Sequence, residues 1–346
     1  MPGIDFGGLD ALSYKTLTGI VQLLPPTPEE QLVGTMFMPY REIDGAIAEW
    51  EVKTMPRDIA TKVTNYDGPS KAVAKIARKK DRVDLVKLQF HEIIKSGDLV
   101  KALAEGSVTE MQWRNLGALI TSELENMRRF IYMGVEYWRW QAITGTLTMN
   151  VDEVNLSAST GVPATHTSAV PASWSNVATD IIGRIRTDKD LIGKDSNKVP
   201  RTMVVTGQVQ EWLMKNTGIK DLMGEQWKTQ IATTGRVTRL LDLDIVTNDI
   251  WYNASGTTTH LWAGANADKY AIFTGEPVGE VQRGVFEVPT NAYGVDGQTE
   301  LVGNRWSFLT TENNDGNVQR ILYAGEVMMP VVLDPNAVVF RSATAA

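Results

Sequence analysis

Apolar residues between positions 107 and 144 recur at the spacing of a single helix face. The gaps between successive members run 3, 4, 4, 3, 4, 4, 3 and 4, which is the α-helical period. Ser107 and Glu110 have the spacing of a capping box, and Gly145 stands where a left-handed C-terminal residue is expected. We predict one helix of about 55 Å, a rod more typical of an extended building block than of a compact enzyme. The members of the stripe are Trp113, Leu116, Ile120, Leu124, Met127, Ile131, Val135, Trp138 and Ala142.

The charged residues of the same segment predict a solvent-exposed face opposite the stripe. Glu125 precedes Arg128 and Arg129, and Glu136 precedes Arg139, at separations of three or four residues. Such pairs stabilise an exposed helix face by a few tenths of a kcal/mol each. The stripe has a period of about 3.6 residues, so the helix should be nearly straight, and a sheet or another helix must cover it.

Two segments ahead of the helix alternate apolar and polar residues, which is typical of half-buried strands. Residues 46–53 place alanine, tryptophan and valine on one face, and residues 86–91 do so with valine, leucine and phenylalanine. The polar stretch between them contains a turn at Asp67-Gly68-Pro69. A short helix is expected at 92–104.

The stretch from Lys53 to Arg82 is strongly basic. It holds nine basic and three acidic residues, about +6, and the whole chain carries −7, so the remainder is near −13. A solvated charged face, contact with nucleic acid and docking on an acidic neighbour all remain open. The stretch lacks the interleaved aromatic residues of single-strand binders. The opposite signs within one chain favour docking over nucleic-acid contact.

Residues 1–40 contain many glycines and prolines, including Pro25-Pro26-Thr27-Pro28. Short apolar runs, Ile20-Val21 and Leu23-Leu24, interrupt them. Such a segment lacks the apolar content for a core of its own. It is therefore either a disordered tail or an arm that becomes ordered on a neighbour, and the apolar runs favour the arm.

The rest of the chain predicts a mixture of helices and strands, and hence an α+β protein. Residues 321–340 alternate apolar runs around Pro330 and Asp334-Pro335, which predicts paired strands that close a sheet. A loop rich in serine, threonine, alanine and proline is expected at 157–175. Further helices are expected at 176–192, 208–215 and 225–241, and strands at 146–156, 203–205, 244–247, 269–273 and 305–309.

Composition and motifs argue against several kinds of chemistry. The 346 residues are 43% hydrophobic and 22% charged, enough for a sizeable core, and the net charge of −7 argues against a basic nucleic-acid-coating surface. The chain has no cysteine, so disulfides, thiolate metal sites and cysteine nucleophiles are excluded. The chain contains no stretch of about twenty apolar residues, so we predict no membrane-spanning helix. We find no signal peptide in the first residues.

Catalytic, cofactor-binding and metal sites are not predicted. Neither phosphate-cradling glycine motif occurs. His91, His166 and His260 are far apart in sequence, and none has a second histidine at zincin spacing. The segment 313–317 lacks the acidic residue that would complete a calcium loop, so we interpret it as a turn.

The order of parts resembles a known family. The closing stretch 326–340, an apolar strand, then Asp334-Pro335, then a second apolar strand, is similar to the ending of lambda-like major capsid proteins. The segment 41–103 resembles the extended loop of that family, including the basic residues before the long helix. The chain thus resembles major capsid proteins of tailed bacteriophages, which have the HK97-type fold.

The resemblance implies an architecture and a set of contacts. It implies an N-terminal arm (1–40), an extended loop (41–91), a peripheral domain (92–199 and 321–346) with spine helix 107–144, and an axial domain (200–320). The loop would overlap a neighbouring subunit. The candidate inter-subunit contact residues are Trp50, Arg57, Lys62, Lys71, Lys75, Arg78, Lys79, Lys80 and Arg82.

The function that the resemblance implies is a structural one. Pentamers and hexamers would close into an icosahedral head that encloses double-stranded DNA without sequence-specific contact, assembled in the host cytoplasm. Portal and scaffolding proteins are expected partners, with a decoration protein as a further one. Some members of the family are crosslinked by a Lys–Asn bond, but no motif assigns such a pair here. An encapsulin-like bacterial compartment shell is the alternative; an unrecognised enzyme or a binding protein is less favoured.

Overall fold

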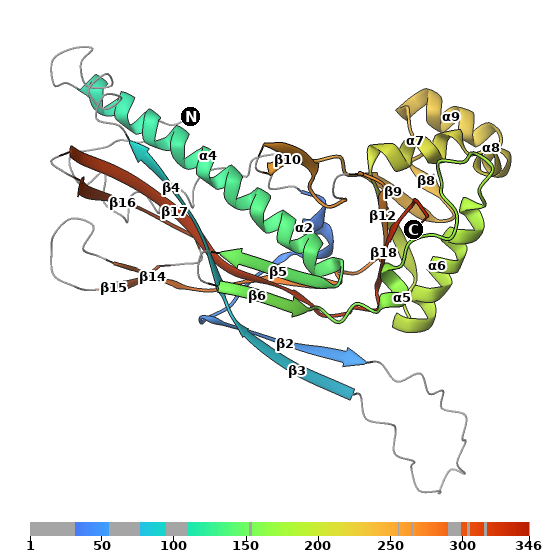
Figure 1. The fold of residues 1–346 in the computed structure, drawn as a ribbon, viewed down its shortest axis with the longest axis horizontal. Helices are drawn as coiled ribbons and strands as arrows, with labels where there is room; N and C mark the ends of the chain where they lie inside the picture. Colours follow the sequence, from blue (N-terminus) through green and yellow to red (C-terminus); the bar gives the residue numbers. More distant parts are fainter. Residues whose placement is uncertain are drawn as a thin grey trace, which may run out of the picture.

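The computed structural model describes residues 32–54, 77–94, 110–151, 154–254, 256–263, 266–289, 299–302, 305–314 and 317–345. Figure 1 shows an elongated α+β molecule with a long helix lying across a long sheet. At the opposite end, short helices surround a second sheet. The expected fold class, with its long spine helix, is confirmed.

The long helix, α4, spans Glu110–Ile143. Every member of the apolar stripe from Ile120 to Ala142 is buried, as the period predicted. Gly145 has a φ of 103°, a backbone conformation that glycine adopts without strain. Residues 107–109 and the side chains of Trp113 and Leu116 lie outside the described part of the chain.

The prediction that the charged residues of α4 face solvent is wrong for three of them. The exposed fractions of Arg128, Glu136 and Arg139 are 4%, 0% and 1%. The reason is that α4 is covered on more than one side, by strands β4 and β17 and also by the short helix α2 (Gly34–Phe37) and strand β5 (Thr146–Val151). A periodic stripe reveals the buried face but not how wide that face is.

The long sheet has the order β1-β13-β17-β16, and β4 also pairs with β17. Its central strand, β17 (Asn317–Val332), is antiparallel to β16 (Arg305–Asn314), β4 (Val86–Ile94) and β13 (Gly279–Arg283). Strand β1 (Tyr40–Glu42) runs parallel to β13. Two neighbouring parallel strands cannot be joined by a short turn. Strand β1 therefore pairs with a strand that is far from it in the sequence.

The second sheet has the order β18-β12-β7-β9-β8 and is buried on both faces. Along β7, Val204 faces the core beneath α4, whereas Met203 and Val205 face a second core among the short helices. This explains why the second half of β7, Met203–Val205, is an unbroken apolar run. The strands are β7 (Pro200–Val205), β8 (Arg239–Leu240), β9 (Leu243–Thr247), β12 (Lys269–Thr274) and β18 (Val338–Ser342).

The short helices around this sheet are α5 (Ala164–Thr167), α6 (Ile181–Ser196), α7 (Gly207–Lys215), α8 (Thr217–Met223) and α9 (Glu225–Thr234). Polar side chains cap three of them. Asp180, Thr206 and Asn216 accept hydrogen bonds from the backbone amides of Gly183, Val209 and Ile219, the usual way to satisfy amides at a helix start. The helix expected at 225–241 is shorter than predicted. It ends at Thr234, because Gly235 adopts the left-handed conformation, with φ 69°.

Several further expectations need correction. Residues 92–94, expected to begin a helix, continue strand β4, and 95–104 lie outside the described residues. Strands β17 and β18 belong to different sheets and do not pair with each other. Strands β18 and β7 share a single sheet. The sequence had placed β18 in the peripheral domain and β7 in the axial domain. The expected domain boundaries thus separate strands that pack together.

Four separate two-stranded hairpins complete the fold of the described residues. The first is β2 (Ile47–Thr54) with β3 (Ala77–Asp84), and the second is β5 with β6 (Val154–Ser159). The third is β10 (Trp251–Ala254) with β11 (Thr257–His260), and the fourth is β14 (Phe286–Pro289) with β15 (Thr299–Val302). The β5–β6 hairpin replaces the single strand that the sequence predicted at 146–156.

Candidate inter-subunit surface

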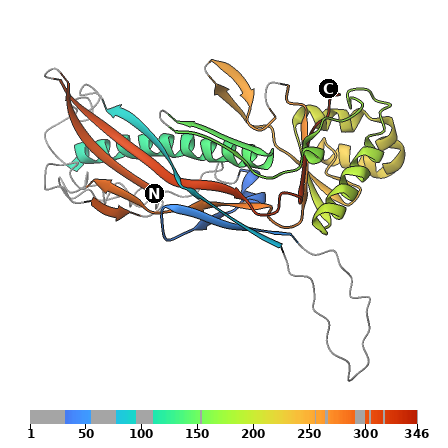
Figure 2. The ribbon, with the colours of Figure 1, turned by 60° about the horizontal axis from the view of Figure 1, so that its bottom comes forward.

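The β2–β3 hairpin extends away from both cores, as Figures 1 and 2 show. It forms a two-stranded sheet of its own, with Ile47 opposite Asp84 at the base and Thr54 opposite Ala77 at the outer end. A two-stranded hairpin alone is at best marginally stable in water, and its outer strand edges offer unpaired backbone groups. This geometry suits a segment that packs on another molecule.

The base of the hairpin is firmly attached to the long sheet. Ala48 is fully buried, and the Gln282 amide donates a hydrogen bond of 2.9 Å to the Glu49 carbonyl. The Leu85 amide donates to the Ala46 carbonyl at 2.9 Å. A Cβ at Gly284 would overlap the Leu85 side chain and the Gly45 carbonyl, so only glycine fits this close approach. The direction of the hairpin is therefore set by the body of the protein.

The strand register matches part of the basic charge within the hairpin itself. Lys80 lies opposite Glu51, and Arg82 lies opposite Glu49. Opposite charges at directly paired positions are favourable, by roughly 0.2–1 kcal/mol. Near the outer end Arg78 lies opposite Lys53, a like-charge pair. The positive charge available to a neighbour therefore increases toward the outer end of the hairpin.

The candidate contact residues are found in three situations. Trp50 is half-buried against the protein's own core, so part of its ring is already used. Arg82 is exposed on β3, the same strand that carries Arg78, Lys79 and Lys80. The remaining candidates lie outside the described residues: Arg57, Lys62, Lys71 and Lys75.

A second feature joins the start of the described chain to the long helix. The buried Glu136 carboxylate accepts hydrogen bonds from the Gly34 amide at 2.7 Å and from Trp140 Nε1 at 2.8 Å. Arg139 Nη1 donates to Glu136 at 3.1 Å and to the Thr35 hydroxyl at 3.1 Å. A buried carboxylate needs such partners, because an unpaired charge in the interior is very costly. This cluster fixes residues 34 and 35 to α4.

Tyr40 extends the same attachment to the sheet. The guanidinium carbon of Arg139 lies 4.3 Å from the centre of its ring, and that of Arg283 lies 3.1 Å from it. Such desolvated contacts are worth about 2 kcal/mol or more. Arg283 Nε also donates a hydrogen bond to the buried Glu326. Burial by itself would lower the pKa of Arg283, but Glu326, with Tyr40 and Tyr132, raises it, so the guanidinium stays charged.

These contacts place residues 32–42, the last part of the expected arm and the start of the expected loop, in the protein's own fold. Phe37 and Met38 are buried, and Phe37 stacks on Phe273 with ring centres 3.7 Å apart. The Val278 and Val281 amides donate to the carbonyls of Phe37 and Pro39, both at 2.9 Å. Residues 1–31 lie outside the described part of the chain. The only sequence signal of this docking was the short apolar run at 36–38.

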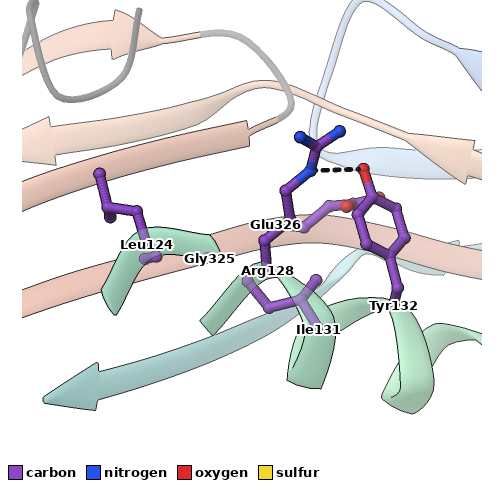
Figure 3. A pocket seen from close by; sticks show the side chains of 7 residues that line it. Leu124, Arg128, Ile131, Tyr132, Gly325 and Glu326 are labelled. Atoms are coloured by element: carbon purple, nitrogen blue, oxygen red, sulfur yellow. Dashed lines mark hydrogen bonds between the residues drawn. The ribbon is translucent and has the colours of Figure 1, made fainter. Parts of the chain in front are cut away.

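Between α4 and β17 the side chains leave only a small gap, shown in Figure 3. Leu124, Arg128, Ile131 and Tyr132 line it from the helix, and Arg128 Nε donates to the Tyr132 hydroxyl at 3.4 Å. Its volume of about 10 Å³ is room for about one water. The interface between helix and sheet is therefore packing, and not a ligand site.

Other kinds of site are not seen in the described part of the chain. Among the described residues no group of three or more histidine, aspartate or glutamate side chains is placed to hold a metal ion. None of the described helices is long and apolar enough to cross a membrane. His166, His260 and His91 are on separate elements. The two buried histidines each contact a single carboxylate, Asp195 and Asp249 respectively.

Comparison with solved structures defines the class of fold. The chain superposes on the putative capsid protein of a prophage of E. coli CFT073 with a TM-score of 0.63 and 13% identity, over 96% of this chain and 99% of that one. A phage-related protein from Bordetella bronchiseptica RB50 gives 0.52 and 11%, over 96% and 98%. The capsid of cyanophage P-SCSP1u gives 0.52 and 12%, over 90% and 88%. The architecture is that of an HK97-type capsid protein.

Comparison with family models then defines the family. Residues 13–340 match the model of phage major capsid protein E. Because this match spans most of the sequence, the chain belongs to the phage major capsid protein E family. A search of curated proteins finds no significant match. The protein is thus a structural subunit of a phage capsid shell, as the sequence predicted.

Proposed function

We propose that this subunit assembles into pentamers and hexamers that close into an icosahedral head around double-stranded DNA. The observation that carries the proposal is the β2–β3 hairpin. Its base is attached to the long sheet and packs against the core through Ala48 and Trp50, and its outer end extends away from the body of the described chain in Figures 1 and 2. Such a segment gains the apolar and charge contacts it lacks when it lies on the next subunit of a ring.

Charge supports this docking. The hairpin strand β3 contributes Arg78, Lys79, Lys80 and Arg82, whereas the remainder of the chain outside residues 53–82 is near −13. An acidic body facing a basic loop on the neighbour gives complementary contacts and also disfavours other arrangements of the subunits. On this proposal DNA is enclosed without sequence-specific contact, because the basic segment is used between proteins.

The parts of the subunit follow from this proposal. Residues 1–24 act as an arm on neighbouring subunits, and the unit of short helices α6 to α9 meets its copies around the five- and six-fold axes. Portal and scaffolding proteins, and in some shells a decoration protein, are the further partners, and assembly takes place in the host cytoplasm. The family match favours a phage head over the bacterial compartment shell considered from the sequence. Purified particles that contain DNA and no enzyme cargo would support the proposal.

The experiment that tests the hairpin's role reverses its charge. Replacing Arg78, Lys79 and Lys80 by glutamate should leave the free subunit folded by circular dichroism but prevent particles in electron micrographs. The matched control replaces the same residues by glutamine, which removes the charge without adding repulsion, and should assemble more slowly but still form shells. If the glutamate variant assembles normally and loses affinity for DNA, the hairpin is a nucleic-acid element and the proposal fails.

A further inference from the structure

An aromatic hollow lies between the C-terminal part of α4 and the β10–β11 hairpin. Its volume is about 220 Å³, and Tyr137, Trp140, Tyr252, His260 and Trp262 are among the nine residues that line it. Figure 1 shows α2 and the β10–β11 hairpin at the C-terminal part of α4, and Figure 2 shows that they lie on different sides of this helix. The hollow is smaller than the roughly 300–1,000 Å³ of a site for a drug-sized ligand. A few side chains of a peptide fit this volume better than a cofactor does.

Tyr137 and Tyr252 are the partly exposed aromatic rings of the hollow, and Trp140, Trp262 and His260 lie buried behind them. Trp140 and Trp262 are stacked with ring centres 4.7 Å apart, and Tyr137 lies 5.6 Å from Tyr252 at 55°. The Trp262 indole donates to the Asn248 carbonyl at 3.0 Å, which fixes its orientation. Burial, and then the neighbouring Tyr137, raises the pKa of Tyr252. Aromatic-lined grooves of this type bind proline-rich segments in the extended polyproline conformation.

The chain itself carries such a segment close by. Pro25-Pro26-Thr27-Pro28 precedes the first described residue, Leu32, by only a few positions. At about 3.1 Å per residue, the span from Thr27 to Leu32 is about 15 Å in a polyproline conformation. The start of the described chain lies next to Trp140, one of the lining residues, because the Gly34 amide and the Trp140 indole donate to the same oxygen of Glu136. Phe37 also lies 6.5 Å from Trp140, edge to face.

We propose that Pro25–Pro28 of the N-terminal segment binds in this aromatic hollow of the same subunit. Prolines lose little conformational entropy on binding, so a short proline segment can dock where a flexible one cannot. Docking there fixes the point from which residues 1–24 leave the subunit, and so sets which neighbour they reach. The inference does not depend on the assembly proposed above, because it concerns one subunit.

The absence of cysteine in the chain makes a direct test simple. We would replace Thr27 and Thr259, a residue lining the hollow, by cysteine in the full-length subunit, and treat it with a short thiol-to-thiol crosslinker. Mass spectrometry should find the two cysteines joined within one chain. The control pairs Thr27→Cys with Thr229→Cys on exposed helix α9, which should give only background crosslinking. Circular dichroism confirms that both variants fold.

A second variant tests whether the prolines are responsible. Replacing Pro25, Pro26 and Pro28 by alanine in the Thr27→Cys/Thr259→Cys chain should reduce the crosslinking rate about tenfold, equivalent to about 1.4 kcal/mol. Equal crosslinking of the Thr259 and Thr229 pairs would overturn the proposal. So would an unchanged rate in the alanine variant, or crosslinks that join only two different chains. None of these results bears on shell formation, so the assembly proposal stands or fails separately.

Discussion

The carboxylate of Glu136 accepts a hydrogen bond of 2.7 Å from the backbone amide of Gly34, a residue 102 positions earlier in the chain. A Cβ at Gly34 would come within 2.7 Å of that carboxylate, so the contact also requires glycine. This pairing joins the first described residues to the C-terminal part of the spine helix. The pairing fixes the position of Gly34 on α4, and so fixes where the N-terminal segment begins.

Replacing Glu136 by glutamine should destabilise the folded subunit by about 3–5 kcal/mol, because the variant leaves the Arg139 guanidinium buried without its carboxylate. The measurement is urea unfolding followed by circular dichroism. The control is Glu211→Gln, which breaks the exposed ion pair with Lys215 and should cost no more than about 1 kcal/mol. Equal costs would show that the Glu136 cluster is not the attachment described above.

Replacing Gly325 by alanine should disturb the contact between β17 and its neighbours. The added Cβ would overlap the buried Trp306 ring and come within 2.8 Å of the Leu88 carbonyl, which belongs to the backbone and cannot move aside. Overpacking of this kind costs about 1–3 kcal/mol or more. In Gly193→Ala, by contrast, the new Cβ comes no closer than 4.0 Å to the Lys198 carbonyl, so helix α6 should gain up to about 1 kcal/mol. Thermal unfolding of the two variants should therefore shift in opposite directions.

The stability of the subunit should fall as the pH drops through the range in which histidine titrates. Burial lowers the pKa of His260 below its ordinary 6.5, and Asp249, at 3.1 Å, only partly offsets this. The unfolded chain therefore binds a proton at a higher pH than the folded one. The contribution of His260 is present above about pH 6.5 and is lost as the pH falls toward the lower folded pKa. Unfolding curves at a series of pH values, compared with His260→Gln, should show a flatter profile for the variant.

The control for that titration is His91→Gln, which changes an exposed histidine on β4. Its pH profile should match that of the unchanged protein. If His260→Gln retains the full pH dependence, the loss of stability belongs to other groups, and burial of His260 is not its cause.

Truncation should separate the two parts of the N-terminal segment. Removing residues 1–30 should leave the fold intact and impair shell formation, because the described packing begins at Leu32. Removing residues 1–42 also deletes Phe37, Met38 and Tyr40 from the core and strand β1 from the long sheet, and should prevent folding. Circular dichroism and size-exclusion chromatography distinguish the outcomes. If the variant that lacks residues 1–30 is unfolded by circular dichroism, those residues belong to the core and the prediction is wrong.

The sequence predicted the elements whose periodicity is local. The stripe from Ile120 to Ala142 gave helix α4, and the alternation at 46–53 and 86–91 gave strands β2 and β4. It failed where pairing is between distant segments. Strand β3 has no apolar alternation, since Arg78, Lys79 and Lys80 follow each other, and it is a strand because β2 pairs with it.

The buried charges were missed for a similar reason. Glu136 and Arg139 have the spacing of an exposed ion pair, and only the docking of α2 against α4 places them in the interior. Of the candidate contact residues, Trp50 lies on β2 and four basic residues lie on β3, and their role between subunits stays a prediction. However, an alternating pattern does not specify the strand register, so it could not show that Glu51 and Glu49 lie opposite Lys80 and Arg82. Register in a hairpin depends on which residues meet across it, and the turn at 67–69 is too far from both strands to specify this.

The most direct test of the central claim, that this chain builds a shell, is electron microscopy of the purified full-length protein during assembly from free subunits. We expect closed, roughly spherical particles of uniform diameter, with rings of five and six subunits in class averages. The β2–β3 hairpin should be found against the adjacent subunit. Single subunits that remain dispersed at high concentration, across low and high salt and with portal and scaffolding proteins present, would contradict the account.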